Sequence, residues 1–172
     1  SRSTVEYLES LGAEVHVWKV GHAFAKNKLR ELGAIFGGEL AGHYYFRDFF
    51  NCDSGILASL LVLQAVKMLK AEGQTIGSFI DSIVRWANSG EVNFTLNEKD
   101  EAMTALYERY VKNDSPTLVM DFDGYRVEFK DWWFNVRKSN TEPYLRLVVE
   151  AATHALLDEK LADLSTIITR FS

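Results

Sequence analysis

The chain has 172 residues, of which 47% are hydrophobic and 25% are charged, and its formal net charge is −5. This composition supports a packed core in one large domain or two small ones. The acidic balance argues against nucleic acid as a partner, because that binding requires a broad basic surface. The single cysteine, Cys52, excludes an internal disulfide framework and fits a reducing compartment.

No part of the sequence resembles a membrane or secretion signal. The longest apolar stretch, Leu57–Val66, is too short to span a bilayer. The first ten residues carry charges and lack the apolar core of a secretory signal. We therefore expect a cytoplasmic protein that has no membrane partner.

The first half of the chain alternates between helical and extended patterns, which predicts a layered α/β unit. The expected helices are Thr4–Leu11, Ala25–Leu32, Asp53–Lys70 and Gln74–Ser89, and the expected strands are Glu14–Val20, Ala34–Phe36 and Tyr44–Phe46. A unit that opens on a helix lacks the strand that should precede it. The pattern predicts a truncated three-layer α/β domain over residues 1–73, followed by a connecting helix and hinge over 74–90.

The second half is richer in strands. Extended patterns cover Val92–Leu96, Thr117–Phe122, Tyr125–Lys130, Trp132–Lys138 and Tyr144–Glu150, and helical patterns cover Glu98–Val111, with Asn97 as its cap, and Thr153–Ile168. Asp123-Gly124 is a tight hairpin signal between two of these strands. We predict an α+β domain over residues 91–172, with a four- to five-stranded antiparallel sheet and two helices.

The segment Arg137-Lys-Ser-Asn-Thr-Glu-Pro143 is the first candidate for a ligand site. It is a turn between two expected strands, and Arg137 and Arg146 flank it. Its short polar side chains are those of Ser139, Asn140 and Thr141. Backbone N–H groups of such a turn can bind an anion, and a guanidinium matches two phosphate oxygens at once. The alternative is a plain hairpin whose polar side chains only satisfy the turn.

The segment Gly37-Gly-Glu-Leu-Ala-Gly-His43 is the second candidate. Its glycines let the backbone approach a ligand closely. Glu39 and His43 have the donors and acceptors that neighbouring sugar hydroxyls require. The alternative is a tight turn in which Glu39 caps a helix.

Three other features of the sequence are weaker indications of a functional site. His22, after Val20-Gly21, is by itself more typical of a structural residue, although it could lie near a phosphate. Asp121 and Asp123 flank a hairpin glycine and are more typical of turn formers. The aromatic run Trp132–Phe134 indicates core packing, and no pattern in the sequence indicates a metal site.

Together these motifs resemble the α-D-phosphohexomutase superfamily. The motifs that carry the resemblance are, in order, Val20–His22, Gly37–His43, Tyr44–Asp48, Asp53–Ile56 and Arg137–Arg146. The last is the most specific, and its Ser-Asn-Thr form is similar to phosphomannomutase/phosphoglucomutase members, since phosphoglucosamine mutases usually carry Ser-Gly-Thr. The resemblance covers most of the family's third domain and all of its fourth, whose fold is TATA-box-binding-protein-like.

The resemblance implies roles for individual residues. Glu39 and His43, with Gly38 and Gly42, would contact the sugar, and His22 would lie near the transferred phosphate. The clamp on the phosphate that stays in place would comprise Arg137, Ser139, Asn140, Thr141 and Arg146. The family's sugar loop commonly has a serine where this chain has Ala41, so one hydrogen bond to a sugar hydroxyl would be missing, a loss of about 0.5–1.5 kcal/mol.

The resemblance also implies an activity, the interconversion of hexose 1-phosphate and hexose 6-phosphate through an enzyme phosphoserine. Mg²⁺ would be the cofactor, and hexose 1,6-bisphosphate would be the intermediate and activator. The family's Thr-Ala-Ser-His-Asn-Pro-like serine loop and Asp-Gly-Asp-Gly-Asp-Arg-like magnesium loop do not occur in this sequence. The chain should therefore need the N-terminal domains of the same protein and be inactive alone. The alternative is a stand-alone phosphosugar-binding module without catalysis.

Overall fold

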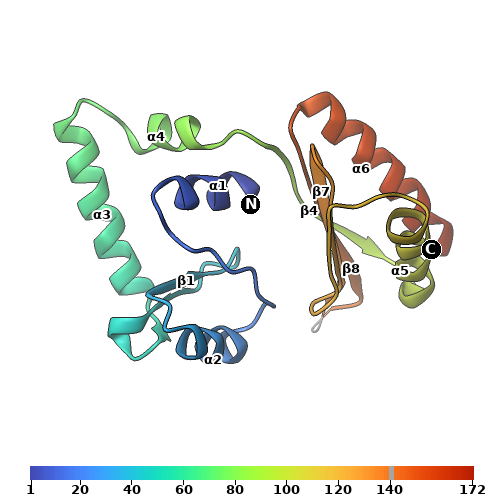
Figure 1. Ribbon diagram of the computed structural model, residues 1–172, viewed down its shortest axis with the longest axis horizontal. Helices are drawn as coiled ribbons and strands as arrows, with labels where there is room; N and C mark the ends of the chain where they lie inside the picture. Colours follow the sequence, from blue (N-terminus) through green and yellow to red (C-terminus); the bar gives the residue numbers. More distant parts are fainter. Residues whose placement is uncertain (140–141) are drawn as a thin grey trace. The chain divides into compact units, whose positions relative to one another are not determined.

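The computed structural model describes residues 1–139 and 142–172. Its contacts divide the chain into two units, each visible in Figure 1. The C-terminal unit combines residues 1–14 with residues 84–172, and the middle unit covers residues 15–83. Helix α1, Arg2–Ser10, belongs by its contacts to the C-terminal unit.

The middle unit is a mixed α/β unit built on a small sheet. Its strands are β1 (Phe36–Gly38), β2 (Tyr44–Phe46) and β3 (Cys52–Asp53), all antiparallel, in the order β1-β2-β3. Its helices are α2 (His22–Leu32), α3 (Gly55–Ala71) and α4 (Ile76–Ile83), with a 3₁₀ turn at Arg47–Phe49. The mixed α/β class predicted for this region is confirmed.

Two local features position the sheet of the middle unit. Helix α3 begins at Ser54, whose Oγ accepts a hydrogen bond from the Leu57 N–H at 3.1 Å. Gly37 lets α2 approach β1, because a Cβ at this position would lie 2.9 Å from Leu29 Cδ1. These two features place α2 and the start of α3 next to the three-stranded sheet of the middle unit.

Two predictions about elements in the first half are wrong. The segment Glu14–Val20 lies outside both sheets, and an extended segment needs a paired neighbour to form a strand. Helix α4 ends at Ile83, not at Ser89. The reason is a long-range contact: the N–H groups of Arg85 and Trp86 donate to Ser3 Oγ at 3.0 and 3.1 Å.

The C-terminal unit is built on a five-stranded antiparallel sheet in the order β4-β8-β7-β6-β5. The strands are β4 (Ala87–Thr95), β5 (Leu118–Met120), β6 (Tyr125–Glu128), β7 (Trp132–Lys138) and β8 (Tyr144–Ala151). Its other helices are α5 (Lys99–Tyr107), continued by a π-helical turn (Glu108–Lys112), and α6 (His154–Ile168), continued by a 3₁₀ turn (Thr169–Phe171). The predicted α+β domain is confirmed.

Single residues determine where several turns and helices of this unit begin or end. Gly124 closes the β5–β6 hairpin with φ of 73°, and a Cβ there would lie 2.1 Å from the Val136 carbonyl oxygen. Thr153 caps α6 by accepting a hydrogen bond from the Leu156 N–H at 3.2 Å. The predicted Asn97 cap is wrong, because α5 begins after Glu98.

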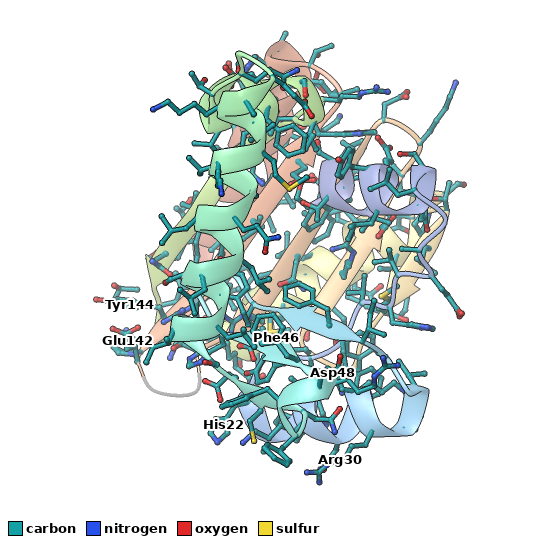
Figure 2. All side chains as sticks on the ribbon, turned by 90° about the vertical axis from the view of Figure 1, so that its left-hand side faces the viewer. His22, Arg30, Phe46, Asp48, Glu142 and Tyr144 are labelled. Atoms are coloured by element: carbon teal, nitrogen blue, oxygen red, sulfur yellow. The ribbon has the colours of Figure 1, made fainter. Side chains whose placement is uncertain are left out.

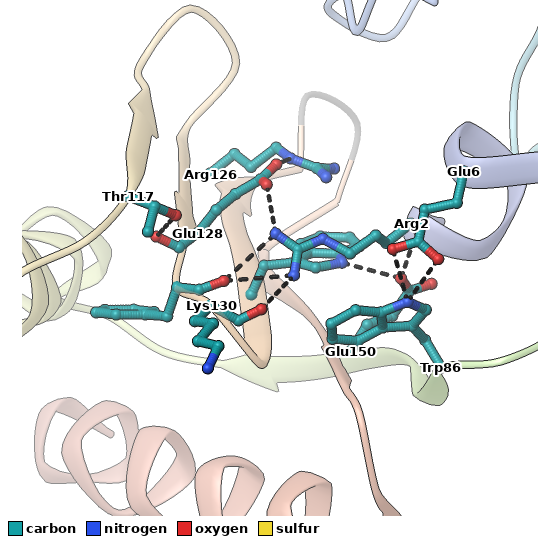
Figure 3. Close-up of polar contacts among 10 residues, drawn as sticks. Arg2, Glu6, Trp86, Thr117, Arg126, Glu128, Lys130 and Glu150 are labelled. Atoms are coloured by element: carbon teal, nitrogen blue, oxygen red, sulfur yellow. Dashed lines mark hydrogen bonds and ion pairs between the residues drawn. The ribbon is translucent and has the colours of Figure 1, made fainter. Parts of the chain in front are cut away.

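Alternation along β7 and β8 gives the sheet two different faces. Helices α5 and α6 cover the inner face (Figure 1), where the side chains of Phe134, Val136, Leu145 and Leu147 are at most 1% exposed. The residues between them point to the opposite side, which we call the outer face. That face carries the polar groups of the C-terminal unit, and α1 contacts one end of it (Figure 3).

A buried carboxylate joins α1 to the outer face. Glu150 is 1% exposed and accepts hydrogen bonds from the Arg2 backbone N–H at 2.7 Å, Trp133 Nε1 at 2.9 Å and Asn88 Nδ2 at 2.6 Å. Burial acts to raise the pKa of Glu150, but the hydrogen bond from the Arg2 N–H, the charge of the chain's amino terminus and the hydrogen bonds from Ser1 and Asn88 outweigh it, and the pKa is lowered. We call Glu150, Arg2, Trp133 and Asn88 the Glu150 cluster.

Further contacts of α1 surround this cluster (Figure 3). The Arg2 guanidinium pairs with the Glu128 carboxylate at 3.0 Å and donates to the carbonyl oxygens of Phe129 and Lys130. Trp86 Nε1 donates to the Glu6 carboxylate at 3.1 Å. Helix α1 is therefore held to the C-terminal unit at several points.

Candidate functional site

The outer face carries two arginines at the end where the β7–β8 turn lies. Arg137 and Arg146 are register partners on β7 and β8, and their side chains are 17% and 21% exposed. Two like charges in this position repel each other. Glu91 on β4 lies within ion-pair distance of both, at 3.1 Å from Arg146 Nη1 and 3.8 Å from Arg137 Nη2. We call Arg137 and Arg146 the arginine pair.

Arg146 retains unused hydrogen-bonding capacity. Its Nη2 atom donates to the Glu142 carboxylate four residues earlier. Its Nε atom is buried and has no hydrogen-bond partner among the described residues. A buried donor without a partner is costly, so it indicates a position where an acceptor from a ligand would be favoured.

The turn between β7 and β8 is held by its own backbone and one hydroxyl. The Ser139 N–H donates to the Tyr144 carbonyl oxygen at 2.9 Å, and the Glu142 N–H donates to Ser139 Oγ at 3.3 Å. Glu142 and Tyr144 are labelled at this turn in Figure 2. Of the predicted phosphate-binding residues, Asn140 and Thr141 lie outside the described residues. The structure brings Arg137, Ser139 and Arg146 together at one turn.

The second candidate, Glu39 and His43, closes the β1–β2 hairpin of the middle unit. The Glu39 N–H donates to the His43 carbonyl oxygen at 2.9 Å, and the Gly42 N–H donates to the Glu39 carbonyl oxygen at 3.0 Å. Gly42 has φ of 86°, and Gly38 pairs with Tyr44 across the hairpin. The structure therefore brings the four predicted sugar-binding residues together in one tight turn, and Glu39 caps no helix there.

Tyr45 holds the Glu39 side chain from the interior. It is fully buried, and its hydroxyl donates a short hydrogen bond to Glu39 Oε1. Burial and the carboxylate of Glu39 both raise the pKa of the Tyr45 hydroxyl, so this group stays protonated and remains a donor. Glu39 is thereby fixed as an acceptor.

Asp53 holds the His43 ring in a similar way. Asp53 Oδ2 lies 2.9 Å from His43 Nδ1. This hydrogen bond holds the pKa of Asp53 below its usual value, against the opposing effect of burial. The side chains of His43 and Asp53 are 48% and 35% exposed, so the ring is supported on one side and open to solvent.

His22, the third candidate, is the first residue of α2 in the middle unit (Figure 2). It follows Gly21, which has φ of 127° and requires a glycine. The side chain is exposed. No described hydrogen bond or ion pair links it to Glu39 or His43, and its role near a phosphate stays a prediction.

Comparison with known proteins gives the family. Residues 1–85 match the phosphoglucomutase/phosphomannomutase alpha/beta/alpha domain III, and residues 91–166 match the C-terminal domain of the same family. The chain belongs to the phosphoglucomutase/phosphomannomutase family. The resemblance seen in the motifs is thereby confirmed.

The chain spans about a third of the length of the curated relatives it matches. It is 36% identical to a phosphomannomutase of Vibrio cholerae, over 99% of this chain and 36% of that protein. It is 39% identical to a phosphomannomutase of Escherichia coli K12, over 88% of this chain and 32% of that protein. A solved phosphoglucomutase/phosphomannomutase family protein from Burkholderia thailandensis has a TM-score of 0.78 and 27% identity, covering 98% of this chain and 35% of that one.

Two further properties of this phosphoglucomutase/phosphomannomutase chain can be read from the described residues. They contain no group of three or more His, Cys, Asp or Glu side chains placed to hold a metal ion. The magnesium ion that the resemblance implies therefore finds no fitting ligand set in the part of the chain that the structure describes. No helix among the described residues is long and apolar enough to cross a bilayer.

Sequence reasoning missed the residues that support the site. Glu91 is remote in sequence from the arginine pair and meets it only through the β4–β8 pairing. Asp53 and Tyr45 lie inside the motifs that carry the family resemblance, but their contacts with His43 and Glu39 depend on the register of β2 and β3. The only signal available was a carboxylate and a phenol in the two segments that follow the glycine-rich turn.

Proposed function

We propose that this chain supplies sugar and phosphate recognition to a phosphohexomutase that interconverts hexose 1-phosphate and hexose 6-phosphate through an enzyme phosphoserine. Mannose and glucose phosphates are the proposed substrates. The observation that carries the proposal is the arginine pair at the β7–β8 turn, where two guanidinium groups lie opposite each other and the buried Nε of Arg146 has no partner among the described residues. Membership of the phosphoglucomutase/phosphomannomutase family supports the same reading.

In this proposal the arginine pair binds the phosphate that stays in place. Two positive charges face two carboxylates, Glu91 and Glu142, so the ligand-free site is close to neutral. Glu142 is 48% exposed and is the carboxylate that a phosphate displaces, whereas Glu91 is 25% exposed and stays to hold both guanidinium groups. Charge-assisted bonds from arginine to phosphate are among the strongest available to a protein. Ser139, Asn140 and Thr141 complete the proposed clamp.

The sugar is recognised by the middle unit in this proposal. Glu39 and His43 take neighbouring hydroxyls, and Gly38 and Gly42 leave the backbone open to close approach. His22 lies near the transferred phosphate. Ala41 offers no hydroxyl, so the hydrogen bonding depends on Glu39 and His43.

The chemistry itself is assigned to other domains of the same cytoplasmic enzyme. The phosphoserine and the Mg²⁺ ligands belong to the N-terminal domains in this proposal, and hexose 1,6-bisphosphate is the intermediate and activator. Phosphoryl transfer requires a positioned nucleophile and neutralisation of charge on the migrating group. The 172-residue chain alone should therefore bind phosphosugars and not interconvert them.

Calorimetric titration with mannose 6-phosphate and glucose 6-phosphate tests the recognition role. The Arg137→Ala variant should bind about tenfold to a hundredfold more weakly, because hydrogen bonds to charged groups contribute about 1.5–3 kcal/mol. Lys138→Ala is the matched control, since Lys138 is the adjacent cation and pairs with Asp100 at 2.7 Å. In the whole enzyme, Arg137→Ala should raise the Michaelis constant strongly. Equal affinity of Arg137→Ala and wild type would contradict the clamp, and a phosphorylated, magnesium-loaded whole enzyme without interconversion would contradict the activity.

A further inference from the structure

We propose that Asp53 is a positioning residue that holds His43 as the tautomer protonated on Nδ1, which leaves Nε2 as a hydrogen-bond acceptor for a ligand hydroxyl. The identity of that hydroxyl as part of a hexose phosphate rests on the proposed function. The tautomer itself depends only on the contact between Asp53 Oδ2 and His43 Nδ1, at 2.9 Å.

The backbone fixes Asp53 in this position from two sides. Asp53 on β3 is the register partner of Tyr45 on β2, and the ring of His43, which lies just before β2, stacks on the ring of Tyr45. The next residue, Ser54, donates its N–H to the Tyr44 carbonyl oxygen at 3.0 Å and caps α3 with its hydroxyl. The carboxylate therefore approaches the ring from a rigid junction between a strand and a helix.

The charge state of Asp53 determines which ring nitrogen carries the proton. The hydrogen bond from His43 lowers the pKa of Asp53, burial opposes it, and the charge of Lys26 lowers it further. An ionised carboxylate can only accept hydrogen bonds, so His43 Nδ1 must be the donor. The other titratable groups at this turn are the Glu39 carboxylate and the Tyr45 hydroxyl, which bond to each other.

The two sugar-binding side chains are then held by equivalent means. Tyr45 donates to one oxygen of Glu39, and Asp53 accepts from one nitrogen of His43. The rings of His43 and Tyr45 are stacked, with centroids 6.4 Å apart. With neutral His43, both ligand-facing groups are acceptors, so the turn selects a ligand that offers two hydroxyl donors. A carboxylate that sets the tautomer of a catalytic histidine has the same function in serine proteases.

The tautomer can be measured directly on the 172-residue chain. Long-range ¹H–¹⁵N spectra at pH 8 distinguish Nδ1–H from Nε2–H, and the chain's other histidines, His16, His22 and His154, provide internal references. We expect His43 to be protonated on Nδ1 in the wild type. In Asp53→Asn, the amide can donate to Nδ1 instead, and His43 should change to the Nε2–H form. A wild-type His43 protonated on Nε2 would overturn the proposal without any variant, as would an unchanged tautomer in Asp53→Asn.

Asp48→Asn is the matched control for this substitution. The Asp48 carboxylate is 90% exposed, lies in the same segment and pairs only with its neighbour Arg47 among the described contacts. Its removal should leave the His43 tautomer unchanged. A change in Asp48→Asn equal to that in Asp53→Asn would mean that the general charge of the segment sets the tautomer, which also contradicts positioning by Asp53.

A binding measurement separates this inference from the proposed function. Asp53→Asn should bind mannose 6-phosphate about fivefold more weakly than the wild type, because one hydrogen bond from the ligand loses its acceptor. The affinity for inorganic phosphate should not change, since the proposed phosphate contacts belong to Arg137 and Arg146. If the wild type binds no hexose phosphate, the proposed function fails and the tautomer result still stands. If it binds and Asp53→Asn binds equally well, the positioning role fails.

Discussion

The two ends of the outer face of the C-terminal sheet carry charged clusters with opposite properties. Glu150 and Arg146 lie on the same strand, β8, about 13 Å apart along it. At one end a carboxylate is 1% exposed and surrounded by three hydrogen-bond donors. At the other end two cations, 17% and 21% exposed, share one carboxylate, and a buried Nε has no described partner.

This difference separates a structural cluster from the proposed phosphate site. The Glu150 cluster is satisfied within the chain and fixes α1 to the sheet, so a ligand would gain nothing there. The arginine pair has donors in excess of its acceptors among the described residues, and an anion from outside can bind these donors. Substitutions in the Glu150 cluster should therefore change the free energy of unfolding equally with and without phosphate. Substitutions around the arginine pair should change it by an amount that depends on phosphate.

The largest effect is expected for Glu150→Ala. Removing this carboxylate leaves Trp133 Nε1 and the Asn88 amide without their partner and detaches the Arg2 N–H. The free energy of unfolding of the C-terminal unit should fall by about 3 kcal/mol, because buried donors that lose their acceptor are costly. Urea unfolding followed by tryptophan fluorescence measures this, because Trp86, Trp132 and Trp133 belong to this unit.

A control variant and a measurement with phosphate test this prediction for Glu150→Ala further. Glu9→Ala removes an exposed carboxylate from the same α1 region and should change the unfolding free energy by no more than about 0.5 kcal/mol. Adding inorganic phosphate should stabilise Glu150→Ala and the wild type equally. A loss in Glu150→Ala that phosphate specifically repairs would show that the Glu150 cluster is part of the ligand site.

Glu91→Gln should lower the free energy of unfolding less than Glu150→Ala does, and its effect should depend on phosphate. Without this carboxylate, Arg137 and Arg146 remain opposite each other with their repulsion uncompensated. The free energy of unfolding should fall by about 1 kcal/mol in the absence of phosphate. Inorganic phosphate should then stabilise Glu91→Gln more than the wild type, because binding to the folded state supplies the missing negative charge. Thermal unfolding with and without phosphate gives both values.

The control for Glu91→Gln is Asp100→Asn. Asp100 pairs with Lys138, the exposed cation next to Arg137, at 2.7 Å. Its loss should have little effect on stability, and phosphate should not distinguish it from the wild type. Equal stabilisation of Glu91→Gln and Asp100→Asn by phosphate would mean that Glu91 does not compensate the arginine pair.

Local signals in the sequence were sufficient to predict the C-terminal sheet. Strands β7 and β8 alternate apolar and polar residues, and Gly124 marks the hairpin that precedes them. The end of α4 could not be predicted this way, because the N–H of Arg85 is taken by Ser3, which lies 82 residues earlier in the chain. Similarly, Glu14–Val20 has the pattern of a strand but pairs with no strand of either sheet. Both errors depend on contacts that sequence periodicity does not contain.

The candidate site also contains residues that could be predicted from the sequence and residues that could not. Glu39 and His43 stand in a glycine-rich motif, and their hairpin partners follow within a few residues, so their proximity was predictable. Asp53 reaches His43, and Glu91 reaches the arginine pair, only through the register of a strand pair, and register depends on the whole sheet. The sequence therefore indicated the groups proposed to meet a ligand, and the structure adds the residues that contact those groups.

The smallest effect is expected for Glu142→Gln, which tests whether the second carboxylate at the arginine pair competes with the ligand. Glu142 pairs with Arg146 Nη2, but it is 48% exposed, and such pairs contribute about 0.5 kcal/mol. Freeing this nitrogen should make inorganic phosphate bind about twofold more tightly, as measured by calorimetry. Glu108→Gln, which breaks an equivalent pair four residues apart with Lys112, is the control and should leave phosphate affinity unchanged. Weaker binding by Glu142→Gln would instead mean that Glu142 orients Arg146 toward the phosphate, and both carboxylates would then act as supports of the pair.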